Sequence, residues 1–243
     1  MRAHPRALLV AAVVVASWAM TACGGHAGAD DSTAGTGSTT TAAATLTGPA
    51  LVARSDNAVD IYTTPDGPAD HSLAATTSFG SPRVLLVTAD QGDWLEVALP
   101  ERPNGSTGWI RRSDVEVHQV DLAIEIDLGA RTLSLFDTGE LVLTTPVAIG
   151  KEAAPTPTGT FYVVDKLATE DPGGAYGPFA FGLSAHSEVL TEFAGGDGQV
   201  GIHGTNDPSS IGQAVSHGCI RVPNYVAETL NQQLELGTPV SIV

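Results

Sequence analysis

Apolar and polar residues alternate along much of the chain, and this period of two predicts strands. The clearest stretch is residues 120–128, where five apolar residues alternate with a second set that is mostly acidic. Nine residues of this pattern indicate a half-buried strand. Further strands are expected at 133–135, 141–143, 161–164, 200–203 and 238–243, with a hairpin turn at 137–140.

Residues 51–117 carry shorter apolar runs that are separated by turn residues. Glycine, proline, aspartate and asparagine punctuate this part of the chain at close spacing. Many short strands in so small a region favour a small barrel. The runs that carry this prediction are 59–62, 84–87, 94–97 and 108–110.

One helix and one long loop are expected in the second half of the chain. Val226, Leu230 and Leu234 fall four apart, so residues 223–236 are predicted to form a helix that Gly237 stops. Residues 168–185 are rich in glycine and carry three aromatic residues, Tyr176, Phe179 and Phe181. A long loop inside a compact domain is more often functional than idle. The alternative is a hairpin whose aromatic side chains pack against the core.

The N-terminal residues predict export. Arg2 and Arg6 precede an apolar run at 7–20, which is too short for a membrane-spanning helix and is typical of a signal peptide. The run ends in Met-Thr-Ala-Cys23, which resembles the lipobox of bacterial lipoproteins with Met in the place of the usual Leu. We expect a lipid on Cys23 and a place in the cell envelope, at the outer face of the cytoplasmic membrane. A plain cleavable signal and a retained anchor are the alternatives.

Composition limits the range of partners. Residues 24–48 are dominated by Ser, Thr, Ala and Gly, which predicts a flexible tether. The formal net charge is −16, so the chain is not expected to bind nucleic acid, because that binding depends on neutralising phosphates. Apolar residues make up 42% of the chain, enough to build a packed core.

The chemically distinctive segment is 202–224, where His203, His217 and Cys219 lie close together in the sequence. If Cys23 is lipidated, Cys219 is the one remaining thiol. A neighbouring imidazole can take the proton of a thiol and make it a nucleophile. The backbone N–H groups of Gly218 and Cys219 are candidates for stabilising an oxyanion. Spacing alone does not decide which histidine is the base.

Two other interpretations of the same residues stay open. Cys219 can be a buried free cysteine with two unrelated surface histidines, since free cysteines are often buried. Alternatively His203, His217 and Cys219 can bind zinc, with or without His186. The single residue between His217 and Cys219 is a tighter spacing than the usual zinc-ligand pairs have.

The segment resembles the signature of the L,D-transpeptidase catalytic domain, the YkuD type. It reads His203-Gly204, then Ser-His-Gly-Cys-Ile-Arg at 216–221, with Asn224 following. The resemblance implies a Cys219 nucleophile, His203 as its base and the Gly204 carbonyl as the group that orients the imidazole. It places His217 in the same site, where it supports the substrate or the oxyanion.

The resemblance also implies three substrate-side residues. Arg221 would contact amide or carboxylate groups, its alternative being a surface ion pair. Ser216 would shape the loop by hydrogen bonds and lie at the substrate. Tyr176 would belong to a flap over the cleft and touch the substrate.

The activity that the resemblance implies is acyl transfer between peptidoglycan stem peptides. A thioester would form at the L-centre of diaminopimelate with release of D-alanine, and an amine of a second stem would resolve it to a 3→3 crosslink. Water as acceptor would give a carboxypeptidase instead. Carbapenems would acylate the same thiol, and no metal or organic cofactor is required. A hydrolytic cysteine peptidase or amidase and a non-catalytic wall-binding lipoprotein are the rivals.

Residues 92–115 resemble, more loosely, a bacterial SH3-like module. Trp94 and Trp109 in it would either bind wall polymer or pack as core aromatics. The expected fold is mainly β: a small SH3-like β-barrel followed by a β-rich YkuD-type catalytic domain with one helix near the C-terminus. The expected divisions are a signal peptide at 1–23, the tether at 24–48, the SH3-like domain at 49–118 and the catalytic domain at 119–243.

Overall fold

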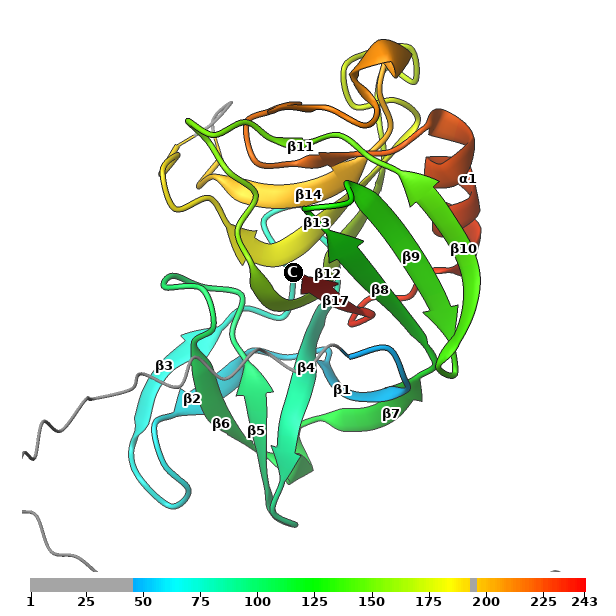
Figure 1. Ribbon diagram of the computed structural model, residues 1–243. Coiled ribbons are helices and arrows are strands. Elements are labelled where there is room, and N and C mark those ends of the chain that lie inside the picture. Colours follow the sequence, from blue (N-terminus) through cyan, green and yellow to red (C-terminus); the bar gives the residue numbers. More distant parts are fainter. Residues whose placement is uncertain (1–45, 193–195) are drawn as a thin grey trace, which may run out of the picture. The chain divides into compact units, whose positions relative to one another are not determined.

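Strands make up most of the regular structure in this protein (Figure 1). The computed structural model describes residues 46–192 and 196–243, and within them it has seventeen strands, two short 3₁₀ turns and one α-helix. The prediction of a mainly β fold is therefore confirmed. The expected signal peptide, the lipidation site Cys23 and almost all of the expected tether lie outside the described residues.

The first sheet is built from the short apolar runs of residues 50–120. Its seven strands pair antiparallel in the order β3-β2-β6-β5-β4-β1-β7. All four runs singled out in the sequence lie in its strands, while the likeness to an SH3-like barrel remains a prediction. The strands are β1 (Ala50–Ser55), β2 (Val59–Tyr62), β3 (Ala69–Leu73), β4 (Arg83–Asp90), β5 (Trp94–Ala98), β6 (Thr107–Arg111) and β7 (Glu116–Val120), with the 3₁₀ turn η1 (Arg112–Asp114) between the last two.

The second sheet has eight strands in the order β10-β9-β8-β17-β12-β13-β14-β16. Two of its neighbouring pairs, β8–β17 and β14–β16, run parallel. The strands are β8 (Leu122–Asp127), β9 (Thr132–Asp137), β10 (Glu140–Pro146), β12 (Gly159–Ala168), β13 (Phe179–His186), β14 (Gln199–His203), β16 (Ile220–Arg221) and β17 (Pro239–Ile242). A separate short parallel pair is formed by β11 (Ile149–Gly150) and β15 (Ala214–Ser216), and η2 (Pro208–Ser210) precedes β15.

The hairpin turn expected at 137–140 joins β9 to β10. Thr138 and Gly139 both have positive φ, 49° and 87°. Two successive left-handed residues are the mark of the turn type whose twist matches that of the flanking strands. The prediction of a hairpin at this point is confirmed.

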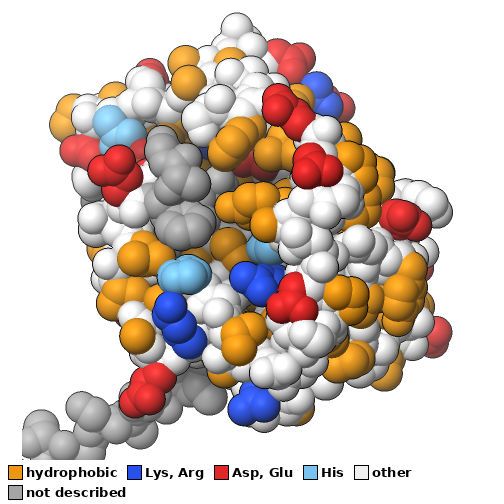
Figure 2. Space-filling model, turned by 90° about the horizontal axis from the view of Figure 1, so that it is seen from above, with side chains coloured by type: hydrophobic (Ala, Val, Ile, Leu, Met, Phe, Trp, Pro, Cys, Tyr) orange, Lys and Arg blue, Asp and Glu red, His pale blue; other side chains and the backbone are white. Residues whose placement is uncertain are grey.

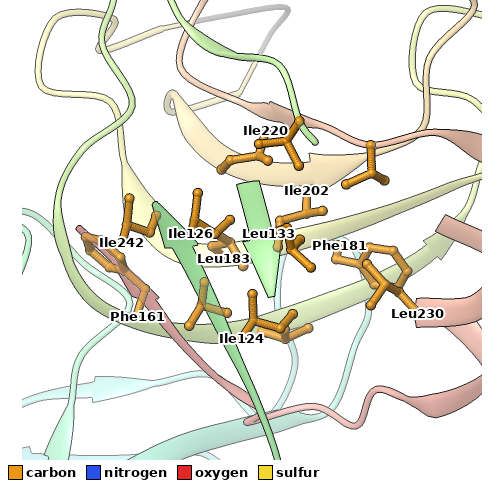
Figure 3. Packing of buried hydrophobic residues seen from close by; sticks show 14 of the residues in the cluster. Ile124, Ile126, Leu133, Phe161, Phe181, Leu183, Ile202, Ile220, Leu230 and Ile242 are labelled. Carbon is orange, nitrogen blue, oxygen red and sulfur yellow. The ribbon is translucent and has the colours of Figure 1, made fainter. Parts of the chain in front are cut away.

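Strand β12 is buried on both of its faces. Phe161 and Val163 point into the core of the second sheet (Figure 3), whereas Tyr162 and Val164 pack with the core residues of the first sheet. The Tyr162 hydroxyl also donates a hydrogen bond to the Ala98 carbonyl, 3.1 Å away. Because successive side chains of a strand point in opposite directions, one apolar strand serves two cores.

The helix is shorter than its apolar spacing predicted. α1 (Asn224–Gln233) ends where Leu234 turns to an extended conformation, so the predicted range 223–236 was too long at its C-terminal end. Gly237 has φ +90° but lies four residues past the helix end. A Cβ there would meet Val52 Cγ1 at 2.6 Å and Val84 Cγ1 at 2.9 Å. Gly237 thus allows a close approach to β1 and β4 rather than stopping the helix.

The glycine-rich loop is also shorter than expected. Only residues 169–178 connect β12 to β13, because Phe179–His186 form a strand. Phe181 is fully buried in the core, whereas Tyr176 stays in the loop and is 44% exposed. The aromatic residues of this stretch therefore divide: Phe181 packs as the hairpin alternative expected, and Tyr176 does not.

No helix in the described part of the chain is long and apolar enough to span a membrane.

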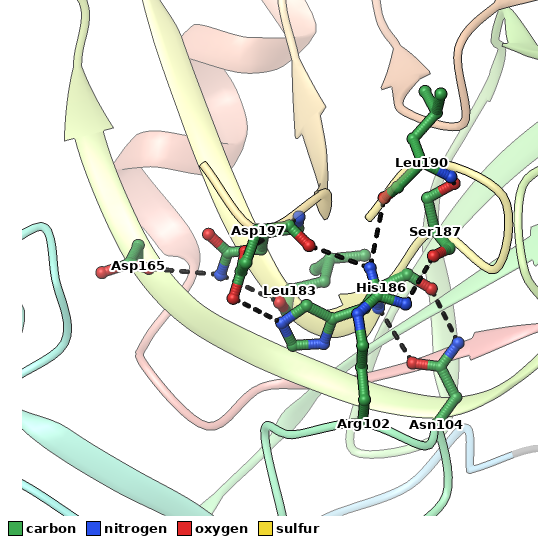
Figure 4. A network of polar contacts seen from close by, with 9 residues as sticks. Arg102, Asn104, Asp165, Leu183, His186, Ser187, Leu190 and Asp197 are labelled. Carbon is green, nitrogen blue, oxygen red and sulfur yellow. Dashed lines mark hydrogen bonds and ion pairs between the residues drawn. The ribbon is translucent and has the colours of Figure 1, made fainter. Parts of the chain in front are cut away.

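The segment after β13 is fastened to the β5–β6 connection by polar contacts (Figure 4). The Arg102 guanidinium donates to the carbonyls of Ser187, Leu190 and Asp197 at 2.6, 3.2 and 2.9 Å. Asn104 exchanges two hydrogen bonds with the backbone of His186, at 2.7 and 2.9 Å. These contacts satisfy exposed and partly buried backbone groups of Ser187, Leu190, Asp197 and His186.

We predict that Gly237→Ala destabilises the protein by about 2–4 kcal/mol. The methyl group would overpack the contact with Val52, and alanine at φ +90° adds backbone strain. Gly80→Ala is the matched control, because its φ is +84° and nothing lies within 4 Å of the added Cβ. Urea unfolding midpoints measure both. Equal losses in the two variants would contradict the close-packing argument.

Candidate active site

The candidate site is organised by the parallel pairing of β14 with β16. The register places Ile202 opposite Ile220 and His203 opposite Arg221. The Val222 N–H donates to the His203 carbonyl at 2.8 Å and continues the pairing past the end of β16. Two segments that are well separated in the sequence are thereby held one strand spacing apart, about 4.8 Å.

The same register sorts the side chains between two faces. Ile202 and Ile220 are fully buried and belong to the core of the second sheet. Because side chains alternate along a strand, His203 and Arg221 share the opposite face, and Cys219, one residue before β16, has the same parity as Arg221. The structure thus brings three of the sequence-predicted site residues, His203, Cys219 and Arg221, to one face at one edge of the sheet.

The imidazole of His203 is held in one tautomer. Its Nδ1 lies 2.6 Å from the Gly204 carbonyl oxygen, so Nδ1 carries the hydrogen and Nε2 is left as the acceptor. Burial lowers the pKa of His203 to about 4; the hydrogen bond to Gly204 opposes that fall and the charge of Arg221 adds to it. His203 is therefore a neutral base at neutral pH. This is the contact that an orienting carbonyl requires, and no carboxylate in the described part of the chain bonds to His203.

Cys219 is the free cysteine of the described residues, and it is half-buried. Burial raises the pKa of its thiol above the ordinary value, while a backbone hydrogen bond with Gly201 and the charge of Arg221 act in the opposite direction. A protonated thiol next to a neutral imidazole differs from a preformed ion pair. In such a pair the proton moves to the base as the sulfur attacks.

Close backbone contacts fix the loop that follows His203. A Cβ on Gly204 would lie 2.5 Å from Asn224 Oδ1 and 3.0 Å from the Gly177 Cα, so only glycine fits. The Thr205 N–H donates to the same Asn224 oxygen at 2.7 Å. Asn224, the first residue of α1, therefore locks the carbonyl that orients His203. The signature contained Asn224, but no role for it followed from the sequence.

Tyr176 lies over the ring of His203. The two ring centroids are 4.7 Å apart, with 56° between the ring planes. Partial burial raises the pKa of Tyr176; a Cys219 thiolate would raise it further, and the charge of Arg221 opposes the rise. The loop that carries Tyr176 is held by bonds from Thr169 to the carbonyls of Gly177 and Pro178. Its proximity fits the expected flap, and contact with substrate remains a prediction.

The loop before Cys219 is stiffened by hydroxyl groups. Ser216 Oγ donates to the Cys219 carbonyl at 2.6 Å and accepts the Gly218 N–H at 3.1 Å. Thr156 Oγ1 donates to the Gly218 carbonyl at 2.9 Å and accepts the Gly150 N–H at 2.9 Å. The sequence attributed only a turn to the stretch around Thr156, and its part in supporting the loop before Cys219 was missed.

These contacts change two expectations. The Gly218 N–H points to Ser216 in this structure and is not free to meet an oxyanion, so the expected role of that donor is not supported. Ser216 is 2% exposed. Its hydroxyl is occupied within the loop, which fits the shaping role and argues against direct binding of substrate. The Cys219 N–H remains the expected oxyanion donor.

Two basic side chains near the thiol, Arg221 and His217, differ in their burial and in their contacts. Arg221 Nε is buried and has no hydrogen-bond partner, and Arg221 forms no ion pair within residues 46–192 and 196–243. The surface ion pair considered for Arg221 is therefore absent there. His217 is exposed, and its Nε2 lies 3.1 Å from Lys151 Nζ.

The other candidate residues are placed away from this face. His186 Nε2 lies 3.1 Å from Asp197 Oδ2 (Figure 4). Among the residues described, no group of three or more His, Cys, Asp or Glu side chains is placed to hold a metal ion. Trp94 is 7% exposed and packs edge-on against Tyr62 with ring centroids 4.9 Å apart, as a core aromatic does. Trp109 is half-buried.

A hollow lined mostly by apolar side chains lies next to the loop after His203. It has a volume of about 430 Å³ and is lined by Thr205, Pro208, Ile211, Pro223, Asn224 and Tyr225. Thr205 and Asn224 join it to the site described above. Nothing in the sequence patterns pointed to this hollow, because its lining comes from two separate segments, the one around η2 and the one that leads into α1.

We predict that Tyr176→Ala raises the pKa of His203 from about 4 toward the ordinary value near 6.5. Burial is the largest cause of the lowered pKa, and the Tyr176 ring covers the imidazole. NMR titration of the His203 ring protons measures the change. Tyr176→Phe keeps the ring and should leave the pKa where it is. An unchanged pKa in Tyr176→Ala would show that other groups bury His203.

Comparison with known proteins finds relatives that are named as L,D-transpeptidases. Two Bacillus proteins provisionally named L,D-transpeptidase YkuD, from B. licheniformis and B. subtilis, are 41% and 39% identical to this chain over 119 residues. Each match covers 49% of this chain and 64% of the relative, so the chain spans less than two thirds of the length of these relatives. The solved structure of the L,D-transpeptidase LdtMt1 with imipenem aligns at a TM-score of 0.45 and 19% identity, over 66% of this chain and 90% of that one.

The family assignment rests on the second half of the chain. Residues 121–242 match the YkuD family model, the L,D-transpeptidase catalytic domain. This range begins just before β8 and ends with β17, and it contains His203, Gly204 and the segment 216–221. Since the match covers half of the chain, the protein belongs to the YkuD family of L,D-transpeptidase catalytic domains.

Proposed function

We propose that this protein is a peptidoglycan L,D-transpeptidase that works through a thioester on Cys219. The observation that carries the proposal is the arrangement around His203. Its Nδ1 is bound to the Gly204 carbonyl at 2.6 Å, and the pairing of β14 with β16 puts it on the same face as Cys219. A base held in one tautomer beside a free thiol is suited to nucleophilic acyl transfer.

The first half-reaction forms the acyl-enzyme. Cys219 Sγ attacks the carbonyl at the L-centre of diaminopimelate in the donor stem, and the thiol proton passes to Nε2 of His203. The tetrahedral intermediate carries a negative oxygen, for which the Cys219 N–H is the expected donor. The intermediate collapses by breaking the C–N bond, and His203 returns the proton to the departing amine. The products are D-alanine and a thioester.

The second half-reaction resolves the thioester. The amine of a diaminopimelate side chain from a second stem attacks the thioester carbonyl and gives a proton to His203. The C–S bond breaks, sulfur leaves as thiolate and regains the proton, and a 3→3 crosslink results. Water in place of the amine would release a tripeptide. No metal or organic cofactor enters either step.

The electrostatics of the site fit chemistry that generates charge only during the reaction. Burial keeps both the thiol and the imidazole neutral before substrate arrives. The charge of the nearby Arg221 favours the thiolate, so its stabilising effect grows as sulfur becomes negative. A site that stabilises charge better in the transition state than at rest accelerates the reaction.

Placement of the enzyme in the cell envelope is part of the proposal. It rests on the sequence of residues 1–48, with the lipobox-like Cys23 and the Ser/Thr-rich stretch after it. An anchor followed by a tether would let the folded residues reach the peptidoglycan from the membrane. Binding of wall polymer by the proposed SH3-like domain, 49–118, would hold the catalytic residues at their substrate.

We predict that a carbapenem adds once, covalently, to the purified protein. Attack of Cys219 on the strained lactam carbonyl uses the same groups as the first half-reaction. Cys219→Ala should abolish the adduct, and His203→Ala should slow its formation by about 10²–10⁴-fold, the usual contribution of a general base. Intact mass spectrometry against time measures both rates. His118→Ala, a histidine of β7, is the matched control and should react like wild type.

No adduct on folded wild-type protein would contradict the proposal and favour a non-catalytic wall-binding protein. An adduct that persists in Cys219→Ala would move the nucleophile to another residue. Circular dichroism of each variant separates loss of chemistry from loss of fold.

We predict that two tetrapeptide stems are converted to a 3→3 crosslinked dimer with one D-alanine released per crosslink. Mass spectrometry of the products identifies the dimer. The measurement is repeated with an acceptor stem whose side-chain amine is acetylated, which should abolish the dimer. Release of D-alanine with tripeptide alone, when a free acceptor amine is present, would instead identify an L,D-carboxypeptidase.

A further inference from the structure

A basic cluster borders the nucleophile's loop, and the reaction steps above use only part of it. The cluster consists of Lys151, His217 and Arg221. Lys151 Nζ lies 3.1 Å from His217 Nε2, and His217 is two residues from Cys219. The Lys151 backbone is fastened to the same loop, because its N–H donates to the Ser216 carbonyl at 3.0 Å. Lys151 is thus held beside the site although it is 68 residues away from Cys219 in the sequence.

Lys151 and Arg221 have no ion-pair partner among the described residues, although the protein is strongly acidic. The chain has 27 acidic and 11 basic residues. Yet within the described residues neither Lys151 nor Arg221 forms an ion pair, and the neighbouring Glu152 is not in such contact either. Figure 2 shows a face on which Lys or Arg side chains lie next to histidines, with apolar side chains around them and Asp or Glu side chains close by. Uncompensated positive charge at a site entrance is suited to an anionic group of the ligand.

We propose that Lys151 is a substrate-binding residue that receives a carboxylate of the stem peptide. This rests on the proposed function, and it names the part of the substrate that the Lys151–His217 pair recognises. A lysine ammonium has three donors and no acceptor, so one N–H is directed to His217 Nε2. That bond sets the direction of the long side chain and leaves two donors for a carboxylate.

The contact between Lys151 Nζ and His217 Nε2 is not needed to stabilise the fold. The turn after β11 is closed by backbone groups: the Ala154 N–H donates to the Lys151 carbonyl at 2.8 Å, and Gly150 is bound by Thr156. These bonds persist whatever side chain stands at position 151. The ammonium–imidazole contact itself is solvent-exposed, and exposed polar pairs contribute little to stability. A function in binding explains why a charged side chain is directed to the loop of the nucleophile.

Two carboxylates of the donor stem are near enough to the reacting carbonyl to be the partner. One is the terminal carboxylate of D-alanine, on the leaving-group side. The other is the side-chain carboxylate of diaminopimelate, on the acyl side. Both have the same chemistry, and stems in which one or the other is converted to an amide distinguish them.

The test measures stem binding in a Cys219→Ala background, where no turnover takes place. NMR titration gives the Kd of three tetrapeptide stems: the parent, the terminal amide and the side-chain amide. With the parent stem, Lys151→Gln should raise the Kd about tenfold, the loss of one charge-assisted contact. Lys151→Arg, which keeps the charge, should restore binding to within about threefold. Arg54→Gln, an exposed arginine of β1, is the control for net charge and should change nothing.

The identity of the carboxylate follows from coupling between enzyme and ligand. The stem whose amide removes the partner carboxylate should bind the background protein and the Lys151→Gln variant with the same Kd. The other amide should still show the tenfold difference. If the background protein and the Lys151→Gln variant bind the parent stem equally, or if the loss is the same on all three stems, the proposal is overturned while the proposed function stands. Absence of binding by every stem would overturn the proposed function and this inference with it.

Discussion

The site depends on one backbone register, that of β14 against β16. A parallel pair shifted by one residue would exchange the faces of every side chain on the shifted strand. Ile202 and Ile220 prevent such a shift, because both are fully buried in the core and neither can turn to solvent without losing about 1.5–3 kcal/mol of burial. Two isoleucines on the core face therefore fix His203, Cys219 and Arg221 on the other.

The loops around this register are held mainly by backbone groups and hydroxyls. In the serine triad a carboxylate orients the imidazole; here the Gly204 carbonyl is placed to do so, and it is itself held by the Asn224 side chain through Thr205. A carboxylate at that point would raise the pKa of His203 and offset the lowering effect of the Arg221 charge. A neutral carbonyl orients the ring and leaves the base neutral. The arrangement is consistent with a buried site in which charge appears only when the thiol ionises.

The sequence predicted much of this because two kinds of pattern are local. Alternation revealed the strands, and the resemblance of His203-Gly204 and the 216–221 segment to a family signature pointed to the candidate site. Contacts between segments that are distant in the sequence could not be predicted from these local patterns. Residues 179–185 were included in the predicted loop at 168–185 because of the glycines around them, yet Phe181 is buried and lies in a strand that pairs with β12. Likewise the competition of Ser216 for the Gly218 N–H is a matter of side-chain rotamer, which no spacing encodes.

Lys151 illustrates the same limit for function. It stands 66 residues before His217, and only the pairing of β11 with β15 brings the two together. The net charge of −16 also gives no indication that Lys151 could bind an anionic ligand, as proposed above. Charge acts over a Debye length of about 8 Å at physiological ionic strength, so acidic residues elsewhere on the surface are largely screened at the site. Among the described residues, Lys151 and Arg221 are two cations near Cys219 that form no ion pair. Net charge therefore informs on partners that cover the whole surface, such as nucleic acid, and says little about a carboxylate that meets one lysine.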